Sequence, residues 1–306
     1  MNLVADETIP KHKLANRLTS VERRLTERFA QNKVLIACVG NIGTGKSSLV
    51  KYLAFNTSMN ALFELPDEGF EDYLPGNDAV HNLLTTSKET AKRTLGAYYG
   101  AINHFLEIHK AHPVESPQWM SAKKSLEKGA LDIQHAYLDL RKMQLQAVTH
   151  LKGSSCIDGS PLADRYAFCE VLHHDMEVPF LSAAGLEEIE IRLKRDFENL
   201  PRPDLMVFLH GSSEALLGNI RERQRAEELD KAKVHGSTGS PCPELPDGLV
   251  RLVKALDHRY HLFMNVVQET KWYRGPVLSI DVAKIDFVSN VRHLIAVFEG
   301  IEKLLP

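Results

Sequence analysis

The sequence predicts an α/β protein whose core is a parallel sheet, and three observations support this class. Short apolar stretches at residues 34–39, 154–158, 204–209 and 276–280 suit strands that are buried on both faces. Segments with helical periodicity separate these stretches, so strands and helices alternate along the chain. A glycine-rich loop directly follows the first strand and precedes a helix, which is the context of a phosphate-binding loop.

The glycine-rich loop occupies residues 40–47 and fits the pattern G-x-x-x-x-G-K-S/T without a mismatch. Its backbone N–H groups and the dipole of the following helix favour a bound phosphate. We expect Lys46 to reach the outer phosphates and the hydroxyl of Ser47 to ligate Mg²⁺. An ordinary glycine-rich turn would leave the adjacent Lys and Ser unexplained. The predicted nucleotide contacts are Gly40, Asn41, Ile42, Gly43, Thr44, Gly45, Lys46, Ser47 and Ser48.

The bulk composition is that of an ordinary globular protein. The chain has 306 residues, of which 43% are hydrophobic and 25% charged, and its net charge is −3. This charge gives no indication of a nucleic-acid partner or an anionic membrane, and no apolar run approaches the length of a membrane span. The four cysteines show no C-x-x-C spacing, and the N-terminus lacks an apolar secretory core. We therefore expect a cytoplasmic protein with partners other than nucleic acid or membrane.

The chain ahead of the first strand predicts one helix at residues 9–31. Leu14, Leu18, Val21 and Leu25 recur there at intervals of three and four residues. We expect this apolar stripe to pack on the core, with a partner helix as the alternative. Residues 1–32 are accordingly assigned to an N-terminal helical extension.

The rest of the chain, residues 33–306, is predicted to be one domain. A short strand is expected at 61–64, and helices at 78–128 (broken at 112–117), 131–150, 186–199 and 248–269, with a C-terminal helix after the last strand. Within this domain we assign residues 75–129 to a helical insertion. Residues 219–247 are assigned to a lid and a flexible loop, because 235–247 are rich in Gly, Ser and Pro.

Five segments, in order, make the chain resemble the deoxynucleoside kinase family. Residues 39–46 are similar to the family loop G-N-I-G-x-G-K, and 134–141 resemble a helix carrying Gln and, seven residues later, Arg. Residues 158–168 resemble the stretch D/E-R-S-x-x-x-D-R-Y-x-F, 220–228 the lid R-G-R-x-x-E, and 276–281 the last strand. The resemblance implies a P-loop NTPase sandwich of three layers, in which helices flank a five-stranded parallel sheet.

The resemblance also implies a reaction, namely transfer of the γ-phosphate of ATP to the 5′-hydroxyl of a deoxynucleoside. ATP and Mg²⁺ would then be the cofactors, and Asp158 would hold Mg²⁺ or its water. In the lid, Arg223 and Arg225 would stabilise the charge of the transferring phosphoryl group, although a solvated helix face is the alternative interpretation. The expected partners are a nucleotide and a small-molecule nucleoside. The sequence leaves open whether the protein forms a homodimer.

One helix carries the residues expected to recognise the base. The side-chain amide of Gln134 offers an acceptor and donors side by side, as the edge of a nucleobase requires. Arg141 lies two turns further on the same helix, and Asp164 can hold it. Such a pair would discriminate between bases, because a wrong ring leaves buried polar groups unpaired. An exposed Gln134 and a surface ion pair of Arg141 with Asp164 are the alternatives.

Two positions depart from the family pattern. The family places a Glu directly before a Pro as the base for the 5′-hydroxyl, whereas Leu65 precedes Pro66 here. Glu64 is our candidate base if the strand end is bulged; Asp67 and Glu68 are substitutes. Gly159 also replaces the Arg of the D-R-S motif. These departures favour an alternative function, a catalytically degenerate nucleotide-binding protein that acts as a sensor or binds a partner. A nucleoside monophosphate kinase is a third interpretation.

Overall fold

The computed structural model describes residues 3, 5, 8, 10–65, 71–223, 245, 247–269 and 272–305. Within them, one five-stranded sheet has the order β2-β3-β1-β4-β5, and every neighbouring pair of strands is parallel. This confirms the predicted α/β sandwich. The strands are β1 (Leu35–Gly40), β2 (Asn60–Leu62), β3 (Ser155–Asp158), β4 (Leu205–His210) and β5 (Val277–Asp281).

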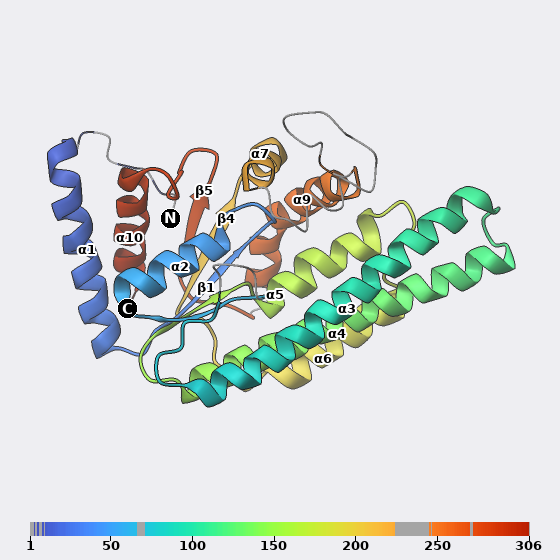
Figure 1. The fold of residues 1–306 in the computed structure, drawn as a ribbon, viewed down its shortest axis with the longest axis horizontal. Helices are drawn as coiled ribbons and strands as arrows, with labels where there is room; N and C mark the ends of the chain where they lie inside the picture. Colours follow the sequence, from blue (N-terminus) through green and yellow to red (C-terminus); the bar gives the residue numbers. More distant parts are fainter. Residues whose placement is uncertain are drawn as a thin grey trace.

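The central strand β1 is buried on both faces, as its continuous apolar sequence predicts. Successive side chains of a strand point to opposite faces. Leu35 and Val39 therefore join one hydrophobic core, and Ile36 and Cys38 join a second core across the sheet. Two helical layers cover these cores, so the molecule has three layers (Figure 1).

One of these layers contains the N-terminal extension. It consists of α1 (Lys11–Gln31), α2 (Lys46–Thr57) and α10 (Val291–Leu304). Val21, Leu25 and Phe29 of α1 are buried in the core of this face, which confirms that the stripe packs on the core. Ion pairs add to the contact of α1 with α10: Arg17 Nε lies 2.7 Å from Glu299 Oε1, and Arg24 pairs with Glu302.

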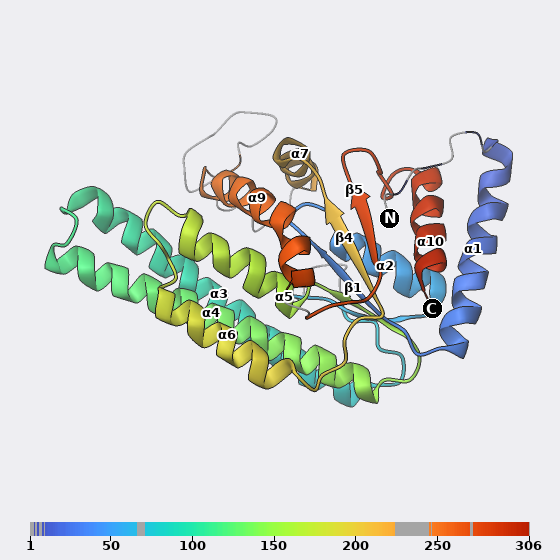
Figure 2. The same cartoon turned by 180° about the vertical axis from the view of Figure 1, so that it is seen from behind.

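The opposite layer contains a long helical pair. Helices α3 (Asp78–Ala111) and α4 (Pro117–His150) lie side by side and extend beyond the sheet (Figure 2). At 34 residues each, they are about 50 Å long. The prediction that a separate helix begins at residue 131 was wrong, because α4 runs without a break from Pro117. Gly129 of α4 faces α3, since a Cβ atom there would be in ordinary contact with Tyr98 and Ala101.

Several shorter segments complete this layer and bring the chain back to the sheet. No helix among the described residues is long and apolar enough to cross a membrane. Because all strands are parallel, their carboxyl ends meet at one edge, where ligands bind in such sheets. The remaining elements are α5 (Pro161–Ala163), the π-helical η1 (Asp164–Cys169) and η2 (Val171–Asp175), α6 (Ala183–Phe197), α7 (Ser213–Arg223) and α9 (Asp247–Glu269).

Candidate active site

The glycine-rich loop connects β1 to α2 at the carboxyl edge of the sheet. Gly43 and Gly45 have φ angles of 83° and 85°, in a region that favours glycine, and Gly45 directly precedes α2. The side chain of Asn41 anchors the loop, because its Nδ2 donates to the carbonyl of Val253 in α9 and its Oδ1 accepts from the N–H of Ile42. The loop conformation is therefore fixed by its own sequence and by α9.

Lys46 lies over the loop. Its Nζ donates to the carbonyl oxygen of Asn41 at 3.0 Å, and the hydroxyl of Thr44 donates to the same oxygen. The neighbouring Ser47 donates its hydroxyl to Asp158 Oδ2 at 2.6 Å. Ser48 follows in the first turn of α2. A phosphate entering the loop would offer Lys46 a stronger acceptor than a carbonyl oxygen, because charge-assisted hydrogen bonds are the stronger ones.

Asp158 ends β3 beside the loop and is suited to a metal ion. Its side chain is buried, and its Oδ1 has no hydrogen-bond partner in the described structure. Burial raises the pKa of Asp158, whereas Lys46 opposes this shift. Mg²⁺ prefers oxygen ligands such as a carboxylate and a hydroxyl, so Asp158 and Ser47 fit this ion. Among the described residues, no group of three or more His, Cys, Asp or Glu side chains forms a separate metal site.

Arg141 of α4 forms the centre of a buried network. Its side chain is 1% exposed, and its guanidinium binds Asp164 Oδ2 at 2.9 Å and Glu64 Oε2 at 2.6 Å. It also donates to the carbonyl of Asp158 at 2.6 Å and to Gln144 Oε1 at 3.2 Å. These bonds use four of its five N–H groups. Arg141 is therefore held in one position by both carboxylates.

This network combines one cation, Arg141, with two carboxylates. Burial alone would lower the pKa of Arg141, but Asp164 and Glu64 raise it above its ordinary value. Burial raises the pKa of Asp164, and Arg141 opposes that shift. Asp164 is the first residue of the π-helix η1, a type of segment that is frequent at functional sites. Breaking a buried pair like this one by removing a single partner is strongly destabilising.

Gly159 explains how Arg141 reaches this position. Gly159 has a φ angle of 95°, and its N–H donates to the carbonyl of Cys38 in β1. A Cβ atom at Gly159 would lie 2.2 Å from Nη2 and 2.6 Å from Cζ of Arg141. The departure from the D-R-S pattern at this position therefore leaves room for a guanidinium group that comes from another element.

Glu64 also lies at this site although it does not directly precede the proline. Strand β2 ends at Leu62, so the alternation of side chains along a strand no longer fixes the direction of Glu64. Its carboxylate contacts Arg141, and its side chain is 33% exposed, which leaves it accessible to a substrate. The substitutes Asp67 and Glu68 lie outside the described residues.

The face of α4 that carries Arg141 contains further polar residues. Gln134 is buried, and its Oε1 accepts from the thiol of Cys169 in η1 at 3.3 Å. Tyr137 lies between Gln134 and Arg141 on this face; burial raises its pKa, and the nearby Glu64 raises it further. Sequence reasoning missed Tyr137 and Gln144, although each lies three residues after a predicted site residue, a spacing that places side chains on one helix face.

The lid can be described only up to α7. Asn219 of α7 donates to the carbonyl of Gly43 at 2.9 Å, and a Cβ at Gly43 would lie 2.9 Å from Ile220, so this helix packs against the phosphate-binding loop. The side chain of Arg223 and the whole of Arg225 lie outside the described residues. Their predicted role in the lid therefore stays a prediction.

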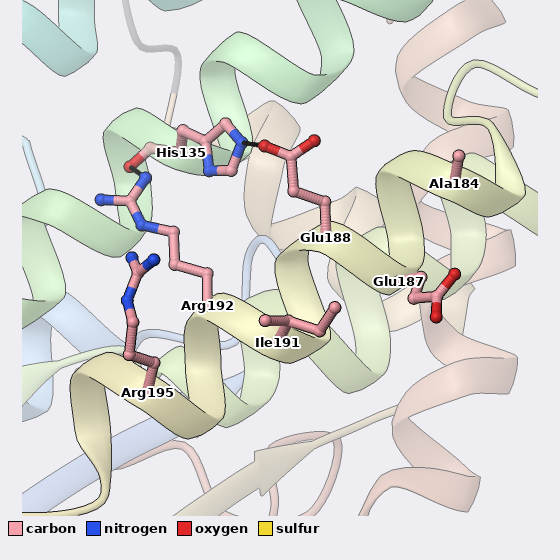
Figure 3. Close-up of a pocket in the computed structure, with 7 residues that line it drawn as sticks. All are labelled: His135, Ala184, Glu187, Glu188, Ile191, Arg192 and Arg195. Atoms are coloured by element: carbon pink, nitrogen blue, oxygen red, sulfur yellow. Dashed lines mark hydrogen bonds and ion pairs between the residues drawn. The ribbon is translucent and has the colours of Figure 1, made fainter.

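A surface pocket of about 420 Å³ lies elsewhere, between α4 and α6. In Figure 3, His135 of α4 faces Glu188 and Arg192 of α6. His135 Nε2 lies 2.8 Å from Glu188 Oε1, and Arg192 pairs with Asp139. No residue of the phosphate-binding loop or of the Arg141 network lines this pocket.

Comparison with known proteins places the chain in a family. A sequence profile described as deoxynucleoside kinase matches residues 36–234, roughly two thirds of the 306 residues. The fold is similar to that of deoxyadenosine kinase from M. mycoides with bound dATP, at 16% identity and a TM-score of 0.50, over 88% of this chain and 100% of that one. The same kinase with the products dCMP and a flexible dCDP bound gives 17% identity and a TM-score of 0.50, over 88% and 99%.

Comparison with curated protein sequences gives no match. At these identities the structural likeness shows the fold alone, whereas the sequence profile covers well over half of the chain. Its match confirms the resemblance that the five segments indicated. The chain belongs to the deoxynucleoside kinase family, a family of phosphate-transferring enzymes.

Proposed function

We propose that this protein transfers the γ-phosphate of ATP to the 5′-hydroxyl of a deoxynucleoside. The observation that carries the proposal is the double role of Asp158. Its carboxylate accepts from Ser47 of the phosphate-binding loop, and its carbonyl accepts from Arg141, which holds Glu64. The residues for ATP and those for the acceptor hydroxyl therefore meet at one residue.

Each residue of the site has a role in this reaction. Glu64 accepts the proton of the 5′-hydroxyl as the oxygen attacks phosphorus, and Arg141 holds its carboxylate in place. Lys46 moves from the Asn41 carbonyl to the phosphates. Bound Mg²⁺, held by Ser47 and Asp158, would neutralise the charge of the phosphates. Arg223 and Arg225 would add positive charge from the lid.

Gln134 is the proposed contact to the base. The thiol of Cys169 holds its carbonyl oxygen, and this fixes the direction of its amide. Arg141 and Asp164 belong to the buried network described above. We propose that these two residues form the end of the nucleoside site opposite Gln134. Base recognition by Arg141 itself would use the one N–H group that its four hydrogen bonds leave over.

The competing function is that of a catalytically degenerate protein that binds a nucleotide and senses it or holds a partner. Leu65 and Gly159 favour it, because both replace residues on which the family pattern depends. Two observations weigh against it. The carboxylate of Glu64 lies within the site, and the guanidinium of Arg141 fills the space beside Gly159.

A phosphorylation assay with labelled ATP and Mg²⁺ tests the proposal against the four deoxynucleosides and their monophosphates. We expect one deoxynucleoside to be phosphorylated, and Lys46→Ala to abolish this activity. Lys51→Ala on the same helix is the matched control and should retain it. ATP binding that depends on Lys46 without any turnover would establish the nucleotide-binding alternative, and turnover of a monophosphate would establish the third interpretation.

A further inference from the structure

A buried ion pair lies close to the site but belongs to none of the interactions above. Lys88 Nζ of α3 lies 2.5 Å from Asp72 Oδ1, and the two side chains are only 4% and 2% exposed. Burial lowers the pKa of Lys88, and Asp72 opposes this shift only in part. Removing two charges from water costs several kcal/mol per ion, so such a pair is weak evidence for stability alone.

The same carboxylate oxygen has a second partner. Asp72 Oδ1 accepts from the backbone N–H of Phe63 at 2.8 Å. Asp72 reaches this N–H because Ala61 and Tyr73 form an antiparallel bridge, which brings the returning chain beside β2. On the other side, the carbonyl of Phe63 accepts from Gln144 Nε2 at 2.9 Å.

Phe63 is the residue immediately before the proposed base. Strand β2 has ended by this point, and side chains from the returning segment and from α4 hold the Phe63 backbone groups. The direction of the Phe63 peptide sets the direction in which Glu64 leaves the backbone. Glu64 then meets Arg141, which Gln144 also contacts. The charge of Asp158 raises the pKa of Lys88 and that of Arg141 lowers it, so this lysine interacts electrostatically with the same network.

We propose that Lys88 and Asp72 are positioning residues that aim Glu64 at the acceptor hydroxyl through the Phe63 backbone. Lys88 orients Asp72, Asp72 holds the N–H of Phe63, and this holds the carboxylate of Glu64 against Arg141. The catalytic part of this inference rests on the proposed kinase function. A misplacement of about 1 Å at a reacting group can cost on the order of 10²-fold in rate, so a residue that touches no substrate can control turnover.

The test compares wild-type protein with Lys88→Met in two measurements. Hydrogen–deuterium exchange of a peptide spanning residues 60–64 includes the Phe63 amide and requires no activity. We expect exchange there to accelerate by about 10-fold or more, because the acceptor of the N–H loses its fixed position. We also expect kcat to fall by about 10- to 100-fold while the dissociation constant of ATP stays unchanged.

Arg17→Met is the matched control, because it breaks a partly buried ion pair between α1 and α10, away from the site. It should lower the melting temperature without changing exchange at 60–64 or kcat. If Lys88→Met does not fold, the pair Lys88→Met with Asp72→Leu leaves no unpaired charge and still removes the acceptor of Phe63. The double variant should then show the same two effects.

Three outcomes separate this inference from the proposed function. Wild-type exchange at residues 60–64 in the folded variants would overturn the positioning role. If exchange is faster but kcat is unchanged in an active enzyme, the inference that Lys88 and Asp72 position Glu64 for catalysis is wrong. A wild-type protein without turnover would refute the kinase function, and the exchange measurement would still decide whether Lys88 and Asp72 hold Phe63.

Discussion

The guanidinium group of Arg141 fills the space that a side chain at Gly159 would need. A Cβ atom at residue 159 would lie 2.2 Å from Nη2 of Arg141, so a residue larger than glycine at position 159 would displace this guanidinium group. Arg141 comes from α4 and Gly159 from the turn after β3. A positive charge therefore remains beside Asp158 although position 159 carries no side chain.

Gly159→Ala should consequently destabilise the protein in two ways. A Cβ at a positive φ costs about 1–2 kcal/mol, and displacement of Arg141 from its hydrogen bonds should add about 2 kcal/mol. Gly153→Ala is the matched control, because Gly153 has a φ angle of 77° but no atom within 4 Å of its added Cβ. Urea denaturation measures both variants. If both variants lose the same free energy of unfolding, displacement of Arg141 does not destabilise the protein, and the prediction is wrong.

Asp158→Asn should make the free protein more stable and the enzyme inactive. Burial raises the pKa of Asp158 above its ordinary value of 3.8, so the folded state holds this proton more tightly than the unfolded state. That contribution to stability is complete below the ordinary pKa and is lost as the pH rises through the raised pKa. An Asn does not titrate, so the stability gain of the variant should grow with pH through this window.

Denaturation midpoints of Asp158→Asn measured without nucleotide, from acidic to neutral pH, test this prediction. Asp132→Asn is the control, because Asp132 is an exposed carboxylate of α4 that pairs with Lys128. Its stability difference from wild type should not grow over the pH range in which Asp158 ionises. A midpoint of Asp158→Asn that stays below wild type at neutral pH would contradict the prediction. The loss of turnover should persist at high Mg²⁺, because the ion would lack its carboxylate ligand.

How far the sequence could predict this structure depends on the range of the interactions. The strands, the phosphate-binding loop and α1 follow from local patterns, and their observed bounds lie within about two residues of the predicted ones. Helix α4 is continuous through Gly129 and packs along α3, and a local pattern does not contain this long-range contact. The π-helical η1, which begins at Asp164, likewise carries no periodicity signal.

One contact within the candidate site could be predicted from the sequence, and another could not. Gln134, Arg141 and Asp164 were predicted from the resemblance to family motifs together with the seven-residue spacing of the first two, and the structure shows the predicted contact of Arg141 with Asp164. The contact of Arg141 with Glu64 joins residues 77 positions apart in the sequence, and it depends on the chain leaving β2 at Phe63. Side chains that hold a backbone beyond the end of a strand leave no periodic pattern, so the direction of Glu64 could not be predicted from the sequence.

Gln134→Leu should reduce discrimination between deoxynucleosides. Leu has about the same size but neither accepts nor donates, so a base would lose its paired edge and the thiol of Cys169 its acceptor. We expect KM for the preferred deoxynucleoside to rise by about 10- to 100-fold with little change in KM for ATP. Steady-state kinetics with all four deoxynucleosides measure this ratio. Gln146→Leu on the same helix is the control, and an unchanged order of preference in Gln134→Leu would assign base recognition to other residues.

Glu64→Gln is the most direct test of the acceptor base. A Gln side chain still accepts a hydrogen bond from Arg141, so the network should keep its geometry, but an amide cannot take the proton of a hydroxyl. We expect kcat to fall by about 10²- to 10⁴-fold, while the dissociation constant of ATP measured by titration stays the same. Glu71→Gln, an exposed carboxylate seven residues further along the chain, should retain full turnover. If Glu64→Gln also retains it, the base is another group, and Asp67 and Glu68 become the next residues to replace.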